Sequence, residues 1–295
     1  MEKWYYKIEL PDGSFTNGTP RENFALCRQF FPRIEKTGLR CLDIGSQDFA
    51  GPVLFLRQGV KELVAYDRLN LESRRKVIAK AYNADFHYAS GISLMGLKQH
   101  LRDNNIGTAF DYVNFCGVLY HMIDPLAGLG LARSFIRTGG IMLLETSFAV
   151  DEGYVARVNH AGKLYDCSNY FQVSLASLDY WLRMLRMKIV DAAFTDPWME
   201  TIGRVVVVCQ AVDEPVAEPE DTWMRKPWVE KDFEPYGLNY AELASTAPPV
   251  VYRGGTGRGV MHEGIDSLNL DATYRKFGAT HIDTNLSVLR LKDVA

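Results

Sequence analysis

Two short apolar runs in the sequence each carry a carboxylate at or near their end. Arg40–Ile44 contains Asp43 and is followed by Gly45, and Leu63–Asp67 ends in Asp67 about twenty residues further on. Both runs have the length and composition of buried strands. Gly45 allows a tight turn and a close approach of a ligand, and an acid at the tip of the next parallel strand can accept hydrogen bonds from both hydroxyls of a ribose. The spacing therefore predicts a nucleoside site across the two strand tips.

The glycines after the first run limit the kind of nucleoside. Gly45 and Gly51 are present, but the Gly-x-Gly-x-x-Gly pattern that cradles a pyrophosphate is not, which argues against a dinucleotide. The alternative is an ordinary strand–turn–helix that binds no ligand. Asp43 and Asp67, taken together with the two glycines, favour the nucleoside site over that alternative.

The elements that must position these residues alternate in type between residues 39 and 148. Apolar runs predict strands at 40–44, 62–67, 84–88, 110–116 and 140–147, and the segments between them predict helices at 52–58, 71–82, 93–104 and 124–137. This alternation predicts a parallel sheet with helices on both faces and a ligand crevice beyond the carboxyl ends of the strands. At the tips of the third and fourth strands, the residues expected to grip an adenine are Ser90, Gly91, Cys116 and Gly117.

Residues 1–38 form a lead-in or cap before the first strand. Residues 4–10 predict an edge strand, and Thr19 with Glu22 predicts a capping box for a helix that ends at Phe31. The aromatic residues at positions 4–6 either cover a cofactor or pack on the edge of the sheet.

Residues 149–184 form an irregular lid insertion within a domain that spans residues 39–212. An amphipathic helix is expected at 175–185, and the apolar runs 188–194 and 204–211 predict two strands that close the sheet as an antiparallel edge.

Residues 213–295 form a C-terminal extension, which is a candidate substrate cover or dimer arm and makes a homodimer an expectation. The acidic, proline-rich stretch 213–235 predicts an extended linker. The cluster Gly254–Gly259 lacks the Gly-Lys-Ser/Thr ending of a phosphate cradle and predicts a loop. Residues 286–291 predict a strand, and His262 and His281 are expected at the surface.

Composition excludes several classes of protein. No apolar run reaches the ~20 residues that span a bilayer, and the N-terminus does not resemble a signal peptide. Five scattered cysteines without a Cys-x-x-Cys pair fit buried thiols in a reducing cytoplasm and do not predict a metal site. The net charge of −3 gives no overall attraction to nucleic acid. A local basic run is either a binding patch or a solvated helix face; it contains Arg68, Arg74, Arg75, Lys76 and Lys80.

The most specific stretch of the chain is Phe110–Leu129, in which Gly-Val-Leu-Tyr-His is followed by Asp-Pro-Leu. It resembles the fourth-strand segment of class I S-adenosylmethionine (SAM) methyltransferases, and within them the tRNA wobble-uridine carboxymethyltransferase-like group. Asp43–Asp48 and Asn169–Phe171 are also similar to that group. The resemblance covers roughly residues 38–211. It implies a Rossmann-like, mostly parallel seven-stranded sheet with an antiparallel last strand.

The resemblance also implies roles for single residues with SAM as the cofactor. Asp43 and Gly45 would hold the methionine end, Asp67 the ribose, and Gly117, Leu119 and Tyr120 the sulfonium side. The other candidate cofactor-binding residues are Ser46, Gly51, Arg68, Ser90, Gly91 and Cys116. Phe49 stands where the pattern usually has a second glycine, so the turn is expected to use Gly51 instead. The tRNA enzymes carry a long basic N-terminal extension before the first strand, whereas here the lead-in before that strand is residues 1–38. Ordinary SAM and a small acceptor are therefore favoured over carboxy-SAM and tRNA.

Methyl transfer to a hydroxyl needs alignment of the acceptor and a base. His121 is the candidate base, and its alternative is a structural role capping the helix that starts at Asp124. Tyr120 is expected beside the sulfonium, whose positive charge favours an aromatic face. Glu145 could position a donor group, bind a metal, cap a helix or form a salt bridge. The candidate residues for acceptor recognition, with plain lid packing as their alternative, are Tyr165, Asn169 and Tyr170.

These observations predict a SAM-dependent O- or N-methyltransferase that acts on a small molecule in natural product biosynthesis. Two alternatives remain at this level: a tRNA-modifying methyl or carboxymethyl transferase, and a non-catalytic SAM-binding protein.

Overall fold

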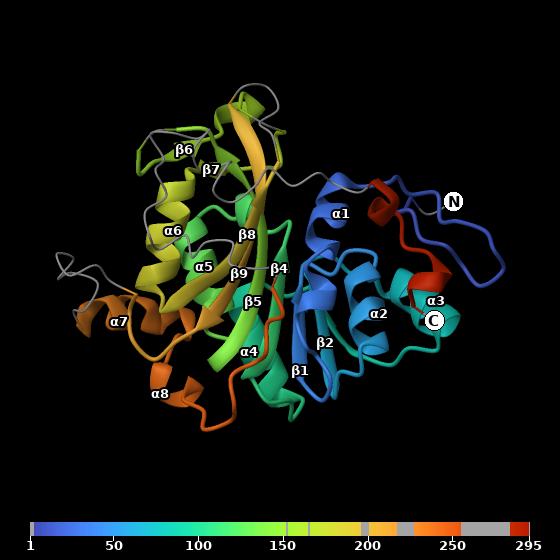
Figure 1. The fold of residues 1–295 in the computed structure, drawn as a ribbon, viewed down its shortest axis with the longest axis horizontal. Coiled ribbons are helices and arrows are strands. Elements are labelled where there is room, and N and C mark those ends of the chain that lie inside the picture. Colours follow the sequence, from blue (N-terminus) through green and yellow to red (C-terminus); the bar gives the residue numbers. More distant parts are fainter. Residues whose placement is uncertain are drawn as a thin grey trace.

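The central element of the computed structural model is a mixed β-sheet in which five parallel strands are followed by two antiparallel ones (Figure 1). The structure describes residues 3–151, 153–164, 166–195, 201–216, 227–254 and 284–294. Within them, the strands are β1 (Arg40–Ile44), β2 (Glu62–Asp67), β3 (His87–Ser90), β4 (Phe110–Cys116), β5 (Ile136–Ala149), β6 (Ala156–Val158), β7 (Phe171–Val173), β8 (Met187–Phe194) and β9 (Ile202–Ala211). The order is β3-β2-β1-β4-β5, and β9 and then β8 continue the sheet beyond β5. This is the predicted Rossmann-like arrangement of seven strands, to which the lid adds β7 and β6 beside β5.

Helices cover both faces of the sheet, as predicted. They are α1 (Glu22–Arg28), α2 (Ala50–Arg57), α3 (Glu72–Tyr82), α4 (Leu94–Asp103), α5 (Pro125–Arg133), α6 (Leu175–Met184), α7 (Pro227–Phe233) and α8 (Tyr240–Leu243). One buried cluster joins α1, α2 and α3 to one face of the sheet, and a second joins α4, α5 and α6 to the other face. In Figure 1, α5 and α6 lie to the left of the sheet, and α1, α2 and α3 lie to its right. Alternate residues of each central strand enter opposite clusters, because successive side chains of a strand point to opposite faces.

The register brings the candidate residues to the same edge of the sheet. Asp43 on β1 pairs in register with Ala65 on β2 and Asn114 on β4, and Asp67 at the end of β2 pairs with Ser90. Since these strands are parallel, their carboxyl ends meet, which is where a ligand crevice forms in such sheets.

Two predicted boundaries near the centre are wrong. The third strand begins at His87 rather than at residue 84, because Asn83 adopts a left-handed conformation that ends α3. The fifth helix ends at Arg133 rather than at 137, and β5 already begins at Ile136. The pairing between β4 and β5 shifts its register between Phe110 and Tyr112, opposite the glycine pair 139–140, and the strand continues past this irregularity.

The N-terminal predictions need correction as well. Residues 4–10 form single bridges, among them Tyr6 with Thr19 and Ile8 with Leu289, rather than a strand. Thr19 is held in its bridge by backbone hydrogen bonds, and Arg21 occupies the position before α1, so the predicted cap is wrong.

The C-terminal predictions fare similarly. Part of the predicted linker is helical, as α7 and the 3₁₀ turn Glu234–Tyr236. Residues 286–291 form 3₁₀ turns and one bridge to the N-terminal segment rather than a strand. Arg28 of α1 forms a 2.7 Å ion pair with Asp293, and Figure 1 shows the C-terminal residues beside the N-terminal ones. Most of the Gly254–Gly259 cluster, His262 and His281 lie outside the described residues.

Candidate nucleoside and acceptor site

A cavity of about 640 Å³ opens at the carboxyl ends of β1, β2 and β4. Of the residues singled out from the sequence, those that line it are Gly45, Asp67, Arg68, Cys116, Gly117, Tyr120, His121 and Tyr170. Those placed outside its lining are Asp43, Ser46, Gly51, Ser90, Gly91, Leu119 and Asn169. Tyr165 lies outside the described residues. The structure therefore brings the tips of β2 and β4 together around one space, as the sequence predicted.

Gly45 forms the wall of the cavity after β1. Its φ of +84° is a left-handed conformation, and a Cβ atom at this position would lie 2.4 Å from the Val118 Cγ2 atom. Only glycine fits both the backbone angle and the space. The next left-handed residues of the turn are Gln47 and Phe49, and Phe49 itself precedes α2 at φ +66°. The expectation that Gly51 replaces the missing glycine is wrong, because Gly51 lies within the first turn of α2.

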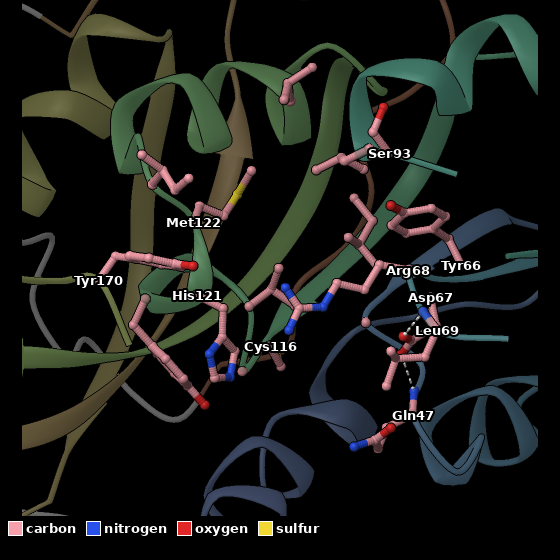
Figure 2. Close-up of a pocket in the computed structure, with 18 of the residues that line it drawn as sticks. Gln47, Tyr66, Asp67, Arg68, Leu69, Ser93, Cys116, His121, Met122 and Tyr170 are labelled. Carbon is pink, nitrogen blue, oxygen red and sulfur yellow. Dashed lines mark hydrogen bonds between the residues drawn. The ribbon is translucent and has the colours of Figure 1, made fainter. Parts of the chain in front are cut away.

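Asp67 is the carboxylate at the tip of β2. It is 7% exposed, and its two oxygens accept backbone hydrogen bonds of 2.9 Å from Gln47 and from Leu69 (Figure 2). Burial raises the pKa of this carboxyl group, while the two backbone donors lower it. Each carboxylate oxygen has a second lone pair. The side chain is therefore fixed in orientation and can still accept hydrogen bonds from a ligand.

Asp43 lies behind the wall of the cavity. It is 2% exposed, and its Oδ1 atom accepts a 2.5 Å hydrogen bond from the Asn114 amide. Burial raises the pKa of Asp43 to about 6, and the Asn114 amide opposes this change. No described cation forms an ion pair with it. A buried carboxylate without a cationic partner is costly, and a positively charged ligand group nearby would lower that cost.

His121 sits in the 3₁₀ turn Leu119–His121 that follows β4. Its Nδ1 atom is 2.8 Å from the backbone carbonyl of Ser168 in the lid. A carbonyl oxygen only accepts, so Nδ1 carries the proton and the neutral ring keeps a lone pair on Nε2. Burial lowers the pKa of His121, which favours this neutral form. The alternative role as a helix cap is wrong, because the Asp124 side chain itself caps α5 through the Ala127 amide.

The hydroxyl group of Tyr120 is held by the arginine of a buried ion pair. Arg204 on β9 pairs with Glu145 on β5, with 2.7 Å between Nη2 and Oε2, and the same Nη2 atom donates to the Tyr120 hydroxyl at 3.1 Å. A Cβ atom on Gly117 would lie 3.5 Å from that hydroxyl and 3.9 Å from Glu145. Of the four roles considered for Glu145, the structure shows the salt bridge. The described residues contain no group of three His, Cys, Asp or Glu side chains that could hold a metal ion.

The lid residues divide between the two interpretations. Tyr170 lines the cavity, whereas Asn169 is buried within the lid, where Asn159 donates to its carbonyl and its own amide donates to the carbonyl of Asp166. The basic run of residues 68–80 also divides, between the cavity wall and the face of a helix. Arg68 lines the cavity, but Arg75 is paired with Glu72 on the face of α3.

The N-terminal lead-in forms one wall of the cavity, which favours the first of the two alternatives for its aromatic residues. Tyr5 and Tyr6 of the lead-in line the cavity together with Asn23 of α1. The fully buried Asp48 holds this segment, because its carboxylate accepts hydrogen bonds from the backbone amides of Tyr5 (2.5 Å) and Tyr6 (2.8 Å) and pairs with Arg74 at 2.7 Å. The aromatic residues at positions 4–6 were the signal for this wall, but only the long-range contact to Asp48 decides where they go.

Other lining residues carried no signal in the sequence. They include Met95 of α4, Met122 and Ile123 of the bend before α5, and Tyr236 of the C-terminal extension. Every helix among the described residues is too short or too polar to cross a lipid bilayer.

Comparison with known proteins supports the architecture. No protein-family model matches the chain. Among curated proteins, it is 28% identical over 176 residues to a tRNA U34 carboxymethyltransferase of Alteromonas mediterranea, covering 56% of this chain and 52% of that protein. It is 26% identical over 166 residues to the tRNA U34 carboxymethyltransferase of Pseudomonas paraeruginosa, covering 56% and 49%. The chain thus spans about half the length of the curated relatives it matches.

Two solved structures share the fold at low sequence identity. The N-terminal domain of EvdMO1, solved in the presence of S-adenosylhomocysteine (SAH) and D-fucose, superposes with a TM-score of 0.52 at 20% identity over 71% of this chain and 92% of that one. The [4+2]-cyclase SpnF also gives a TM-score of 0.52, at 12% identity over 64% and 80%. The chain therefore has the class I SAM-dependent methyltransferase fold and is distantly related in sequence to tRNA U34 carboxymethyltransferases.

Proposed function

We propose that this chain is a SAM-dependent methyltransferase that methylates an oxygen or nitrogen of a small molecule and serves natural product biosynthesis. The observation that carries the proposal is Asp67, which is fixed at the tip of β2 and opens into the cavity across from Gly45 and Gly117. That arrangement matches a nucleoside lying over the tips of neighbouring parallel strands.

The residues around the cavity fit SAM in two independent ways. Asp67 keeps lone pairs for the ribose hydroxyls, and the turn at Gly45 leaves its backbone uncovered toward the cavity. Asp43 supplies a buried negative charge without a cationic partner close to that turn, which suits the ammonium group of the methionine end. Ser46, Gly51, Ser90, Gly91 and Leu119 do not line the cavity, so we assign them a supporting role.

The chain's own residues would align the acceptor and take its proton. SAM supplies an electrophilic methyl group on a positively charged sulfur. When the acceptor is a hydroxyl, His121 Nε2 would accept its proton as the acceptor oxygen takes the methyl group. Tyr120, whose hydroxyl is held by Arg204 and lies close to Gly117, lines the same cavity, where an aromatic side chain can stabilise a cationic sulfur.

The N-terminal wall and the C-terminal extension would exclude water during transfer. Tyr5 and Tyr6 close one side of the cavity, and Tyr236 and Tyr170 line it from the extension and the lid. We assign the extension a substrate cover on this basis, and the homodimer stays a prediction.

Two other functions each rest on one comparison. The curated relatives are named tRNA U34 carboxymethyltransferases, which favours carboxymethyl transfer to tRNA as a second candidate. The SpnF structure is titled a [4+2]-cyclase, so the same fold also serves chemistry other than methyl transfer. A protein that binds SAM without methylating an acceptor is therefore a third candidate.

Calorimetry with SAM and SAH tests the cofactor. We expect both to bind the wild type, and Asp67→Ala to lose most of that affinity. Asp85→Ala, which removes an exposed carboxylate outside the cavity, should bind as the wild type does. No binding to the wild type, or equal binding to Asp67→Ala, contradicts the proposal. Transfer from labelled SAM to phenols, acids, amines and bulk tRNA, measured side by side, then separates the three functions.

A further inference from the structure

Among the described residues that line the cavity, Arg68 is an arginine that forms neither a hydrogen bond nor an ion pair. It follows Asp67 at the end of β2, and in Figure 2 its guanidinium reaches toward the middle of the cavity, on the side of Cys116 and His121. Among the described arginines, every other one has a hydrogen bond, an ion pair or an aromatic ring as partner, and none is found for Arg68. Its donors are therefore available to a ligand.

No acid among the described lining residues forms an ion pair with Arg68, although its charge acts on Asp67: burial raises the pKa of Asp67, and Arg68 opposes that change. Asp67 accepts two backbone hydrogen bonds, and Asp124 is engaged in capping α5. The charge of Arg68 still acts across the cavity: the pKa of His121 is lowered first by burial and further by Arg68. The guanidinium thus makes one part of the cavity electropositive, next to the nitrogen that we propose as the base.

A second donor faces the cavity from the opposite wall. Tyr170 points into it from the lid in Figure 2, and no described residue hydrogen-bonds its hydroxyl group. A guanidinium offers a planar pair of N–H donors that matches a carboxylate or a phosphate, and a phenol can donate to another of its oxygens.

The rim of the cavity is apolar and uncovered. Four of its large side chains are well exposed: Ile123 at 72%, Met95 at 59%, Leu69 at 49% and Tyr170 at 46%. Exposed apolar side chains that gather at one concave site mark a ligand groove, whereas singly scattered ones do not. The part of the ligand that crosses this rim should therefore be apolar.

We propose that the methyl acceptor is an amphipathic acid, whose carboxylate or phosphate group is bound by Arg68 and whose apolar body lies against the rim. The inference rests on the proposed function and names the substrate class of the same cavity. Arg68 acts here as a specificity residue, and it removes the desolvation cost of an anion that a neutral wall would leave unpaired.

Binding of three matched ligands to the SAH-loaded and SAH-free protein tests the proposal by calorimetry. The ligands are hexanoate, the neutral hexanamide and hexyl phosphate. The proteins are the wild type, Arg68→Gln, Arg68→Lys and, as a control, Arg57→Gln. Arg57 donates to the carbonyl of Tyr82 outside the cavity, so its replacement removes the same charge elsewhere.

We expect an anion to bind the wild type, and its affinity to fall about tenfold or more in Arg68→Gln, partly recover in Arg68→Lys and stay unchanged in Arg57→Gln. Hexanamide should be insensitive to all three changes. Tighter binding of hexyl phosphate than of hexanoate, lost in Arg68→Gln, assigns the anion as a phosphate, and the reverse order assigns a carboxylate.

Three results overturn the proposal: neither anion binds the wild type, Arg68→Gln binds both as the wild type does, or Arg68→Gln lowers SAH affinity as much as anion affinity. The last result would make Arg68 a cofactor residue. If SAH does not bind the wild type, the proposed cofactor fails, while the measurements without SAH still decide whether Arg68 binds the anion.

Discussion

Replacing Gly45 by alanine tests the turn after β1 against a matched position in the same sheet. Gly45 and Gly91 both have left-handed backbone angles, with φ of +84° and +70°, so alanine should cost each about 1–2 kcal/mol of conformational strain. They differ in their surroundings. A Cβ atom on Gly45 would lie 2.4 Å from Val118 Cγ2, whereas nothing lies within 4 Å of one on Gly91.

The contact at Gly45 adds a second cost. Forcing a methyl group into filled space typically costs another ~1–3 kcal/mol, so we expect Gly45→Ala to lose about 2–5 kcal/mol of unfolding free energy and Gly91→Ala about 1–2 kcal/mol. Val118 lines the cavity, so relief of the contact would move it or the turn at the proposed methionine end. SAH affinity should therefore fall at least about tenfold in Gly45→Ala and hardly change in Gly91→Ala.

Denaturant unfolding and calorimetry with SAH on the two variants give both quantities. If Gly45→Ala and Gly91→Ala lose the same stability and bind SAH equally well, the contact with Val118 has no consequence and the assignment of this turn is refuted. If Gly91→Ala alone loses SAH affinity, the sequence prediction for Gly91 is restored.

Four further outcomes follow from single contacts. Asp48→Asn removes the charge that holds the backbone of Tyr5 and Tyr6, so amide hydrogen exchange at residues 5–8 should accelerate. The affinity for the acceptor should fall about tenfold, while the affinity for SAH should not change. Unchanged amide exchange would contradict the role of Asp48 in holding this segment. His121→Gln should lower kcat about 10²–10⁴-fold for a hydroxyl acceptor. Because burial lowers the pKa of His121, kcat/KM of the wild type should stay level as the pH falls to ~6.5 and decline only below that pH. A decline that begins above pH 7 would contradict the assignment of a neutral His121 as the base. Burial raises the pKa of Asp43 to about 6, and the ammonium group of a bound SAH would lower it. SAH binding at pH 6 should therefore release protons and give a buffer-dependent enthalpy, which Asp43→Asn should abolish. Proton uptake on binding would contradict the placement of the ammonium group near Asp43. Glu145→Gln leaves Arg204 buried without its counter-charge and should cost about 3–5 kcal/mol of unfolding free energy, while a loss under 1 kcal/mol would show that the pair is dispensable.

The order of the central elements could be predicted from the sequence because it depends on local signals. The runs at 40–44, 62–67 and 110–116 are short, apolar and bounded by turn residues, and each is a strand with those limits. The alternation of these runs with helical segments leaves few topologies for a sheet. The errors occur where a local signal competes with long-range pairing. Thr19 has the side chain of a helix cap, but its backbone is taken by a bridge to Tyr6.

The site divides in the same way. Asp67, Gly45, Tyr120 and His121 stand directly at strand ends, so their convergence on one edge follows from parallel pairing alone. Asp43 shows the limit of this inference, because it is buried behind the cavity wall that its neighbours Ile44 and Gly45 line.

The sequence by itself determined the fold class, the edge of the sheet that carries the cavity and several of the residues that line it, among them Gly45, Asp67 and Gly117, since these depend on spacing along a few strands. Only the tertiary structure decided what surrounds that space. The N-terminal wall is placed by contacts of Tyr5 and Tyr6 with Asp48, more than forty residues away, and the apolar rim gathers side chains from four separate segments. Contacts between distant parts of a chain depend on how the elements pack in three dimensions, and no local pattern encodes them.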